Sequence, residues 1–133
     1  MFEIDLRSRR SIYEQVMDRM KEQILVGVIG PDEKLPSVRD LSKTLTVNPN
    51  TVQKAFRELE RQGYIYTSSG VGSFASPLDG MRADDGQIAE TRAALADNMR
   101  ELYYLTRDVG AVRAIVDEEM GELPVTGGGG SGK

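Results

Sequence analysis

Apolar residues recur at helical spacing in three segments of the first half of the chain. The first segment carries them at Tyr13, Val16, Met17, Met20 and Ile24. Ser11 with Glu14 three residues later is the pattern of a capping box, so a helix is expected to start there and to end near Gly27. Ser37 with Asp40 offers a second capping box, which predicts a short helix. The apolar positions of that helix are Val38, Leu41 and Leu45.

A third helix is expected to begin at Asn48 and Pro49, because asparagine is a favoured N-cap and proline costs nothing at the first helical position. One face of this helix is apolar and consists of Val52, Ala55, Phe56 and Leu59. The opposite face is polar and basic, with Asn50, Gln53, Lys54, Arg57 and Arg61. The apolar face is expected in the core and the basic face in solvent.

Two short β-forming segments, 64–67 and 73–75, flank a glycine-rich stretch and predict a hairpin. Three helices followed by a hairpin make a winged helix-turn-helix, which we assign to residues 1–76. Alternating apolar and polar residues at 2–6 predict a short half-buried strand in front of it. The expected fold class is mainly α with a small β-hairpin, followed by a short C-terminal helical segment.

Proline, glycine and aspartate are frequent in residues 77–86, as in a linker. Beyond it an apolar residue recurs every seven positions, at Ile88, Leu95, Leu102, Val109, Val116 and Leu123. Further apolar residues lie between these positions, at Met99, Leu105, Val112 and Met120. Because Gly110 interrupts the pattern, residues 87–123 are expected to form a helix of about 20 residues, a turn or kink, and a second short helix. Residues 124–133 are expected to be disordered.

A pair of short helices buries too little surface alone, and a seven-residue repeat favours contact between helices. Residues 87–123 are therefore expected to form a two-fold homodimer. The residues expected at this interface are Ile88, Leu95, Met99, Leu102, Val109, Val112 and Val116. Packing of the stripe against the winged helix of the same chain is the alternative.

The chain has no cysteine and no histidine, so it lacks the residues of disulfides, zinc fingers, thiol catalysis and most acid–base catalysis. We expect no enzyme activity, metal or cofactor. No apolar run approaches the roughly 20 residues that cross a bilayer, so a cytoplasmic protein without membrane contact is expected. The acidic runs at 84–85 and 117–119 are more typical of solvated faces than of metal ligands.

The net charge of −4 does not argue against DNA binding once it is divided by region. Residues 1–76 hold 11 lysines and arginines against 10 acidic residues, whereas residues 77–133 hold 6 against 11. The acidity therefore belongs to the second region, and the face that carries the basic residues matters more than the total.

A helix-turn-helix brings the first residues of its second helix to base edges in the major groove. The residues in this position are Asn48, Asn50, Thr51, Gln53 and Lys54. Asparagine and glutamine can pair bidentately with adenine, and lysine can reach guanine or phosphate. Arg57 and Arg61 are better placed for phosphates, and Arg39 for a base or a phosphate. Gly70 and Gly72 let the wing backbone approach DNA closely.

Four motifs occur within residues 12–75: Ile-Tyr-Glu-Gln at 12–15, Leu-Pro-Ser-Val-Arg at 35–39, Val-Asn-Pro-Asn-Thr-Val at 47–52 and Gly-Val-Gly-Ser-Phe at 70–74. Their combination resembles the DNA-binding domain of the GntR family, and the short helical region after it is most similar to the YtrA-type subfamily. The resemblance implies a small dimeric repressor of operator DNA, often of neighbouring transporter genes. It also implies DNA contacts from Ser37, Arg39, Asn48, Asn50, Thr51, Gln53 and Gly70.

The sequence departs from the family pattern at Thr46 and Asp32, where the family commonly has glycine. A left-handed backbone at Thr46 would therefore be strained. The segment after Gly110 is shorter than usual in the subfamily. The family's large effector domains cannot fit after Ser76, so a small-molecule effector would bind between the C-terminal helices and the winged helix, or at the dimer interface.

Other interpretations compete with DNA reading. The basic face of the third helix is also compatible with an ordinary solvated surface, and Arg39 with an ion pair to Asp40 or Glu33. A winged helix can instead bind a protein partner, but large apolar anchors are absent at positions 50, 53, 54 and 57. An enzyme or an architectural DNA-compacting protein fits the composition less well. The Gly-x-x-x-x-Gly-Lys at 127–133 is expected to be a chance match rather than a phosphate loop, which needs a strand before it and a helix and a Ser/Thr after it.

Overall fold

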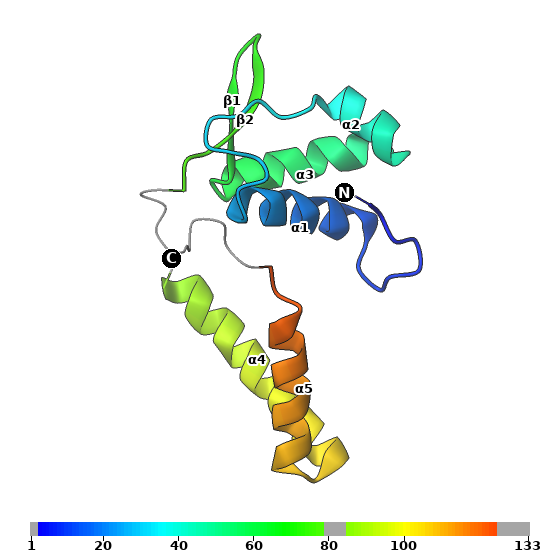
Figure 1. Ribbon diagram of the computed structural model, residues 1–133, viewed down its shortest axis with the longest axis vertical. Coiled ribbons are helices and arrows are strands. Elements are labelled where there is room, and N and C mark those ends of the chain that lie inside the picture. The colour runs from blue at the N-terminus through cyan, green and yellow to red at the C-terminus, as the bar shows by residue number, and fades with distance from the viewer. Residues whose placement is uncertain (1–2, 79–84, 125–133) are drawn as a thin grey trace. The chain divides into compact units, whose positions relative to one another are not determined.

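The computed structural model describes residues 3–78 and 85–124 (Figure 1). These residues fall into two compact units, 3–78 and 85–124. The first unit holds three helices and a hairpin, and the second holds two helices, so the expected fold class is confirmed. No helix among the described residues is long and apolar enough to cross a membrane. Residue 2 of the expected strand, most of the expected linker and the glycine-rich end lie outside the described residues.

Helix α1 (Ile12–Leu25) begins with the capping box expected from the sequence. The Ser11 hydroxyl accepts from the Glu14 backbone N–H, and the Glu14 carboxylate accepts from the Ser11 N–H at 3.0 Å. The Ser11 N–H and the Ser11 hydroxyl both donate to the Glu14 carboxylate, and together with the charge of Arg10 they hold the pKa of Glu14 below its ordinary value. The helix gives way at its far end to Gly27, whose φ of +86° suits glycine.

Helices α2 (Val38–Leu45) and α3 (Pro49–Arg61) form the helix-turn-helix. Ser37 caps α2 by accepting from the Asp40 N–H, but the reciprocal half of the expected capping box is not formed. The shorter aspartate reaches back less easily than glutamate would. Asn48 caps α3 by accepting from the Asn50 N–H at 2.8 Å, and Pro49 follows at the first position, as expected.

The turn between α2 and α3 stores backbone strain at Thr46, which has φ 56° and ψ 50°. A β-branched residue in this left-handed conformation costs roughly 1–2 kcal/mol, against roughly 0.5–1 kcal/mol for the entropy that glycine loses. We therefore expect Thr46→Gly to stabilise the protein by about 0.5–1 kcal/mol in chemical denaturation. Thr44→Gly, inside α2, is the matched control and is expected to destabilise by about 0.3–0.5 kcal/mol, the difference between the helix propensities of threonine and glycine. A lower denaturation midpoint for Thr46→Gly would contradict this account.

The wing is an antiparallel hairpin of β1 (Ile65–Ser68) and β2 (Gly72–Ala75), in which Ile65 pairs with Ala75. The segment before α2 adds a third, irregular edge along β2. The Asp32 N–H donates to the Ala75 carbonyl at 2.8 Å, and the Leu35 N–H donates to the Ser73 carbonyl at 2.8 Å. The start of α2 is therefore tied to the wing, which holds the two parts of the expected DNA surface in fixed register.

The core of the first unit lies between α1, α3 and the hairpin. Its most buried large side chains are Val16, Met20, Val52, Leu59 and Ile65. All the predicted core positions of α1 except Tyr13, and all those of α3, are buried. Tyr13 is partly buried at the edge of this core. The apolar stripes read from the sequence therefore describe the packing correctly.

The strand expected at 2–6 is not formed in the described part of that segment. The Asp5 backbone instead binds the side chain of Gln15, with the Asp5 N–H donating to Gln15 Oε1 at 2.7 Å. Ile4 packs against the core cluster. The buried amide of Gln15 therefore supplies the hydrogen bonds that a neighbouring strand would have supplied to this backbone. The alternation of apolar residues could not indicate such a partner.

The second unit is a helical hairpin of α4 (Asp85–Thr106) and α5 (Val109–Gly121). The chain turns at Arg107, which has φ 57°, and Asp108 caps α5 by accepting from the Gly110 N–H at 2.9 Å. A long helix, a turn and a short helix were expected, but with Gly110 as the interruption. Gly110 instead lies in the first turn of α5, where it costs little, because the Asp108 cap fixes the break before it.

Candidate DNA interface

The exposed face of α3 presents polar side chains that have no partner in the part of the chain that the structure describes. Asn50, Gln53 and Arg57 are exposed. Their side chains make no hydrogen bond or ion pair with any residue that the structure describes. Their donors and acceptors are therefore available to a ligand at no internal cost.

Two other predicted contact residues, Ser37 and Asn48, are already engaged as helix caps. The Ser37 hydroxyl oxygen accepts from the Asp40 N–H at 3.0 Å, and the Asn48 Oδ1 accepts from the Asn50 N–H. The Ser37 hydroxyl hydrogen and the Asn48 amide N–H groups are still donors after capping. Both residues can therefore donate to phosphates, but Asn48 cannot make the bidentate adenine contact without giving up its cap.

Lys54, another predicted contact residue, lies on the side of α3 that faces α1. The Lys54 ammonium lies over the Tyr13 ring, 4.7 Å from its centroid. Thr51 is half-buried. The sequence placed Lys54 on the DNA face but did not indicate this contact, which joins two helices through a cation–π interaction.

Arg61, expected to reach phosphates, is instead paired within its own helix. Its guanidinium donates to both carboxylate oxygens of Glu58. The hydrogen bonds from Arg61 and then Gln62 lower the pKa of Glu58 from 4.5 to about 2. The ion pair therefore persists at neutral pH, and whatever stability it adds is lost as the pH falls below 4.5 towards 2.

This ion pair makes a testable difference to DNA binding. Glu58→Gln removes the carboxylate and releases Arg61, so we expect the variant to bind DNA more tightly and with a steeper salt dependence. One further phosphate contact per protomer, or two per dimer, would steepen the slope of log affinity against log salt by roughly 2. Glu60→Gln on the same helix is the control for charge alone. Fluorescence titration at several salt concentrations checks both variants, and equal slopes would contradict the release of Arg61.

Arg39 lies exposed in the first turn of α2 and forms no ion pair with Asp40 or Glu33. Glu33 instead accepts from the Gly30 N–H at 2.9 Å. Because Ser37 caps the same helix end, Arg39 stands beside the start of the helix that crosses the DNA backbone in this motif. The surface ion pair considered for Arg39 is therefore not formed.

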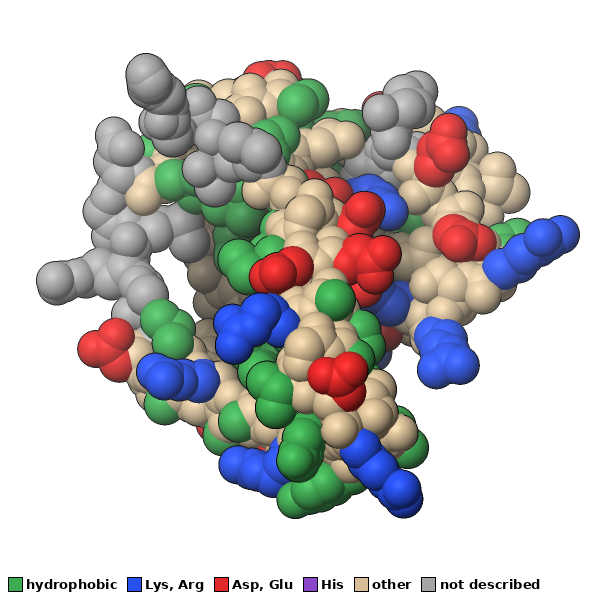
Figure 2. All heavy atoms as spheres, turned by 60° about the horizontal axis from the view of Figure 1, so that its bottom comes forward, with side chains coloured by type: hydrophobic (Ala, Val, Ile, Leu, Met, Phe, Trp, Pro, Cys, Tyr) green, Lys and Arg blue, Asp and Glu red, His purple; other side chains and the backbone are tan. Residues whose placement is uncertain are grey.

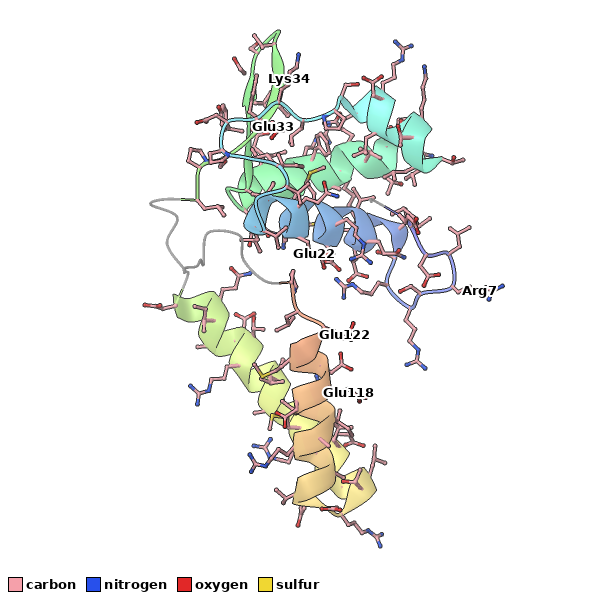
Figure 3. The ribbon with its side chains drawn as sticks, viewed as in Figure 1. Arg7, Glu22, Glu33, Lys34, Glu118 and Glu122 are labelled. Carbon is pink, nitrogen blue, oxygen red and sulfur yellow. The ribbon has the colours of Figure 1, made fainter. Side chains whose placement is uncertain are left out.

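The wing tip has the backbone that its glycines allow, with φ of +77° at Gly70 and +143° at Gly72. Lys34 crosses the wing at Gly72, where an added Cβ would lie 2.9 Å from Lys34 Cε (Figure 3). At the base of the wing the Tyr66 ring stacks on Phe74, and its hydroxyl donates to Asp32 at 2.7 Å, which raises the pKa of Tyr66. Lys34 is a basic residue beside the wing that the sequence pattern did not indicate. It lies there because its backbone pairs with Phe74 of β2, which is distant in the sequence.

The residues predicted for dimerisation divide between the inside and the outside of the α4–α5 hairpin. Val112 is buried between the helices, and Leu102 and Val116 are half-buried. The other four are exposed within the described residues: Ile88, Leu95, Met99 and Val109. The seven-residue repeat therefore does not form one seam, because the turn at Arg107 folds its second half back onto its first.

A groove of about 440 Å³ runs between α4 and α5. Its lining is mostly apolar and includes Met99, Tyr103, Val109 and Val116. Apolar side chains lie open on this end of the second unit, among arginines and acidic residues (Figure 2). An apolar surface of this kind on a two-helix unit is typical of an interface with another chain.

The fold and this surface define a class: a winged helix-turn-helix DNA-binding domain joined to a helical hairpin. The model of the GntR family of bacterial regulatory proteins matches residues 12–74. The transcriptional repressor YtrA of Bacillus subtilis is 40% identical over 104 residues, which cover 78% of this chain and 80% of that protein. The chain therefore belongs to the GntR family and is a DNA-binding transcriptional regulator rather than an enzyme.

Solved structures agree with this assignment. A protein of Listeria monocytogenes named a transcriptional antiterminator has a TM-score of 0.81 and 38% identity, with 90% of each chain covered. The DNA-binding domain of AraR, solved in complex with an operator, has a TM-score of 0.50 and 29% identity over 57% of this chain and 93% of that one. The second of these links the winged helix to operator DNA in a relative.

Proposed function

We propose that this protein is a transcriptional repressor that binds an inverted-repeat operator as a homodimer. Asn50, Thr51 and Gln53 read base edges, while Ser37, Arg39, Asn48 and Arg57 contact phosphates. Lys54 adds a phosphate contact beside α1, and the wing approaches the DNA at Gly70 and Gly72. The phosphate contacts fix the position of the protein on the duplex, and the base contacts determine which sequence it prefers.

The observation that carries the proposal is the unpartnered polar face of α3. Asn50 and Gln53 each have an amide group that can pair bidentately with adenine, and neither amide has a hydrogen-bond partner among residues 3–78 and 85–124. The fixed N-cap at Asn48 points the first turn of α3 in a defined direction. A partner protein would be better served by large apolar side chains at these positions.

Dimerisation is supported by the apolar side chains that the hairpin leaves in solvent. Ile88 and Leu95 are each about half exposed, at 52% and 53%, and Val109 is 60% exposed. A second hairpin related by a two-fold axis would cover them and present two α3 helices to two half-sites. We assign DNA binding to residues 1–76 and dimerisation to residues 87–123, with residues 77–86 as the linker.

Repression follows from occupying a site that polymerase needs, and the name of the Bacillus relative supports this direction of regulation. The protein would act in the cytoplasm, on operators near its own gene, including those of transporter genes. We place a small-molecule effector at the dimer interface.

Selection from a random duplex library tests DNA reading, and transcription in vitro from a promoter carrying the selected site tests repression. We expect an inverted repeat to be enriched and initiation from the promoter to fall as protein is added. Read-through of a downstream terminator is measured in the same reactions, because one structural relative is named an antiterminator. A rise in read-through without a fall in initiation would overturn repression, and the absence of any inverted repeat would overturn the proposed operator.

A further inference from the structure

The segment in front of α1 is a loop held by hydrogen bonds to α1, and two of its arginines have no partner among the described residues. Gln15 is a polar side chain only 6% exposed, and it accepts from the Asp5 N–H at 2.7 Å. Its Nε2 donates to the Asp5 carbonyl at 2.8 Å and to the Arg10 carbonyl at 3.0 Å. One buried amide therefore ties both ends of residues 5–10, which we call the arginine loop, to the first turn of α1.

Further hydrogen bonds give the arginine loop a defined shape. The Arg7 N–H donates to Asp5 Oδ1 at 2.9 Å, and the Arg10 N–H donates to the Ser8 hydroxyl at 3.0 Å. The loop backbone is therefore ordered before any ligand binds, which reduces the entropy lost on binding.

The three arginines of the loop are not equivalent. Arg10 is committed to the protein, because its guanidinium pairs with Asp18 at 2.7 Å and with Glu14 at 3.9 Å. Arg7 and Arg9 are exposed, and their side chains pair with no residue that the structure describes. Figure 3 shows Arg7 pointing outward from the loop. Glu14 and Asp18 both hold Arg10, so Arg7 and Arg9 are the two guanidinium groups of the loop that are left for a ligand.

The loop lies beside the reading helix, on the flank opposite to the wing. Tyr13 in the first turn of α1 contacts Lys54 of α3, so the start of α1 borders the reading face. On the other flank of α3, the Thr67 hydroxyl of the hairpin donates to Glu60 at 3.1 Å. The first turns of α1 and α3 lie at the same end of the unit (Figure 1). A helix in the major groove has a phosphate backbone on each side, so the flank beside the loop faces one of them.

From this arrangement we infer that Arg7 and Arg9 bind the phosphodiester backbone that borders each half-site on the side away from the wing. The inference rests on the proposed DNA reading by α3. It assigns a contact surface outside the helix-turn-helix and the wing, held in place by Gln15. Arginine suits the task because its fork of N–H donors matches phosphate oxygens and stays charged.

The test uses the full chain and a duplex that the wild type has selected. Arg7→Gln with Arg9→Gln removes four positive charges from a dimer, and each neutralised phosphate contributes about 0.9 to the salt slope. We expect the slope of log affinity against log salt to become shallower by roughly 3–4, so that a rise from 50 to 200 mM salt costs the variant about 100-fold less affinity than the wild type. Arg107→Gln, which removes an exposed arginine from the α4–α5 turn, is the control and is expected to leave the slope unchanged.

Phosphate-ethylation interference locates the contacts. In the wild type, ethylated phosphates on both flanks of each half-site are expected to block binding. In the double variant, ethylation of the phosphates on one flank of each half-site should no longer affect binding, whereas ethylation on the other flank should still block it. An unchanged interference pattern and salt slope would overturn the inference. If the wild type selects no duplex at all, the proposed DNA reading has failed instead, so the two failures are distinguishable.

Discussion

Replacing Leu95 and Met99 together with aspartate is expected to convert the protein from a dimer to a monomer and to lower operator affinity by about 10²–10⁴-fold. Both side chains lie on the open side of α4, with 53% and 37% of their surface exposed, and Met99 lines the groove. A charge in a covered apolar interface loses its water without gaining a partner, so the two hairpins should separate. The loss of affinity follows because each half-site must then be bound independently.

Sedimentation or light scattering measures the mass, and titration with the full operator and with a single half-site measures affinity. The monomer should bind both duplexes equally, with a salt slope about half that of the wild-type dimer on the full operator. Ala94→Asp places one such charge roughly 100–140° around α4 from Leu95 and Met99, and it is expected to leave a dimer. Circular dichroism checks that both variants keep their helices. A double variant that stays dimeric would remove α4 from the interface.

Local rules in the sequence were sufficient for much of the fold. Ser11 and Glu14 form the capping box that their spacing predicts, and Asn48 with Pro49 starts α3. The two departures from the family's glycines, Asp32 and Thr46, both have the left-handed backbone that glycine would favour, with φ of 62° and 56°. Each of these features depends on residues close in sequence, so a linear pattern specifies it.

The predictions from the sequence were wrong or incomplete where contacts between residues distant in the chain decide the structure. Gln15 hydrogen-bonds the backbone of the segment that was expected to be a strand, and Lys54 packs over Tyr13. Neither contact produces a periodic pattern in the sequence. The seven-residue repeat continues without interruption through the turn at Arg107. The spacing of apolar residues does not show that Asp108 caps a new helix there. The contact residues proposed for DNA could be placed on a face, but which side chains were free required the structure.

Asn50→Ala and Gln53→Ala are expected to relax the base preference of the protein at symmetric positions in the two half-sites. Each bidentate contact to adenine supplies about 1–3 kcal/mol of discrimination, so each variant should lose about 5- to 150-fold of selectivity per half-site. Nonspecific affinity should change little, since it derives from phosphates. Asn98→Ala, an exposed asparagine of α4, is the matched control and should select the wild-type sequence.

Arg57→Ala separates the two kinds of contact on the same helix. Arg57 lies one turn beyond Gln53 and is unpaired among the described residues, so its removal should weaken binding to every sequence alike and make the salt slope shallower by about 2 per dimer. Selection from random duplexes should therefore return the wild-type operator for Arg57→Ala and a degenerate one for Asn50→Ala. Because all three side chains share one exposed face of α3, a general distortion of that helix would move both readouts together. If the asparagine and glutamine variants select the wild-type operator with full discrimination, base reading lies elsewhere, and the first turn of α3 only positions the protein on its DNA.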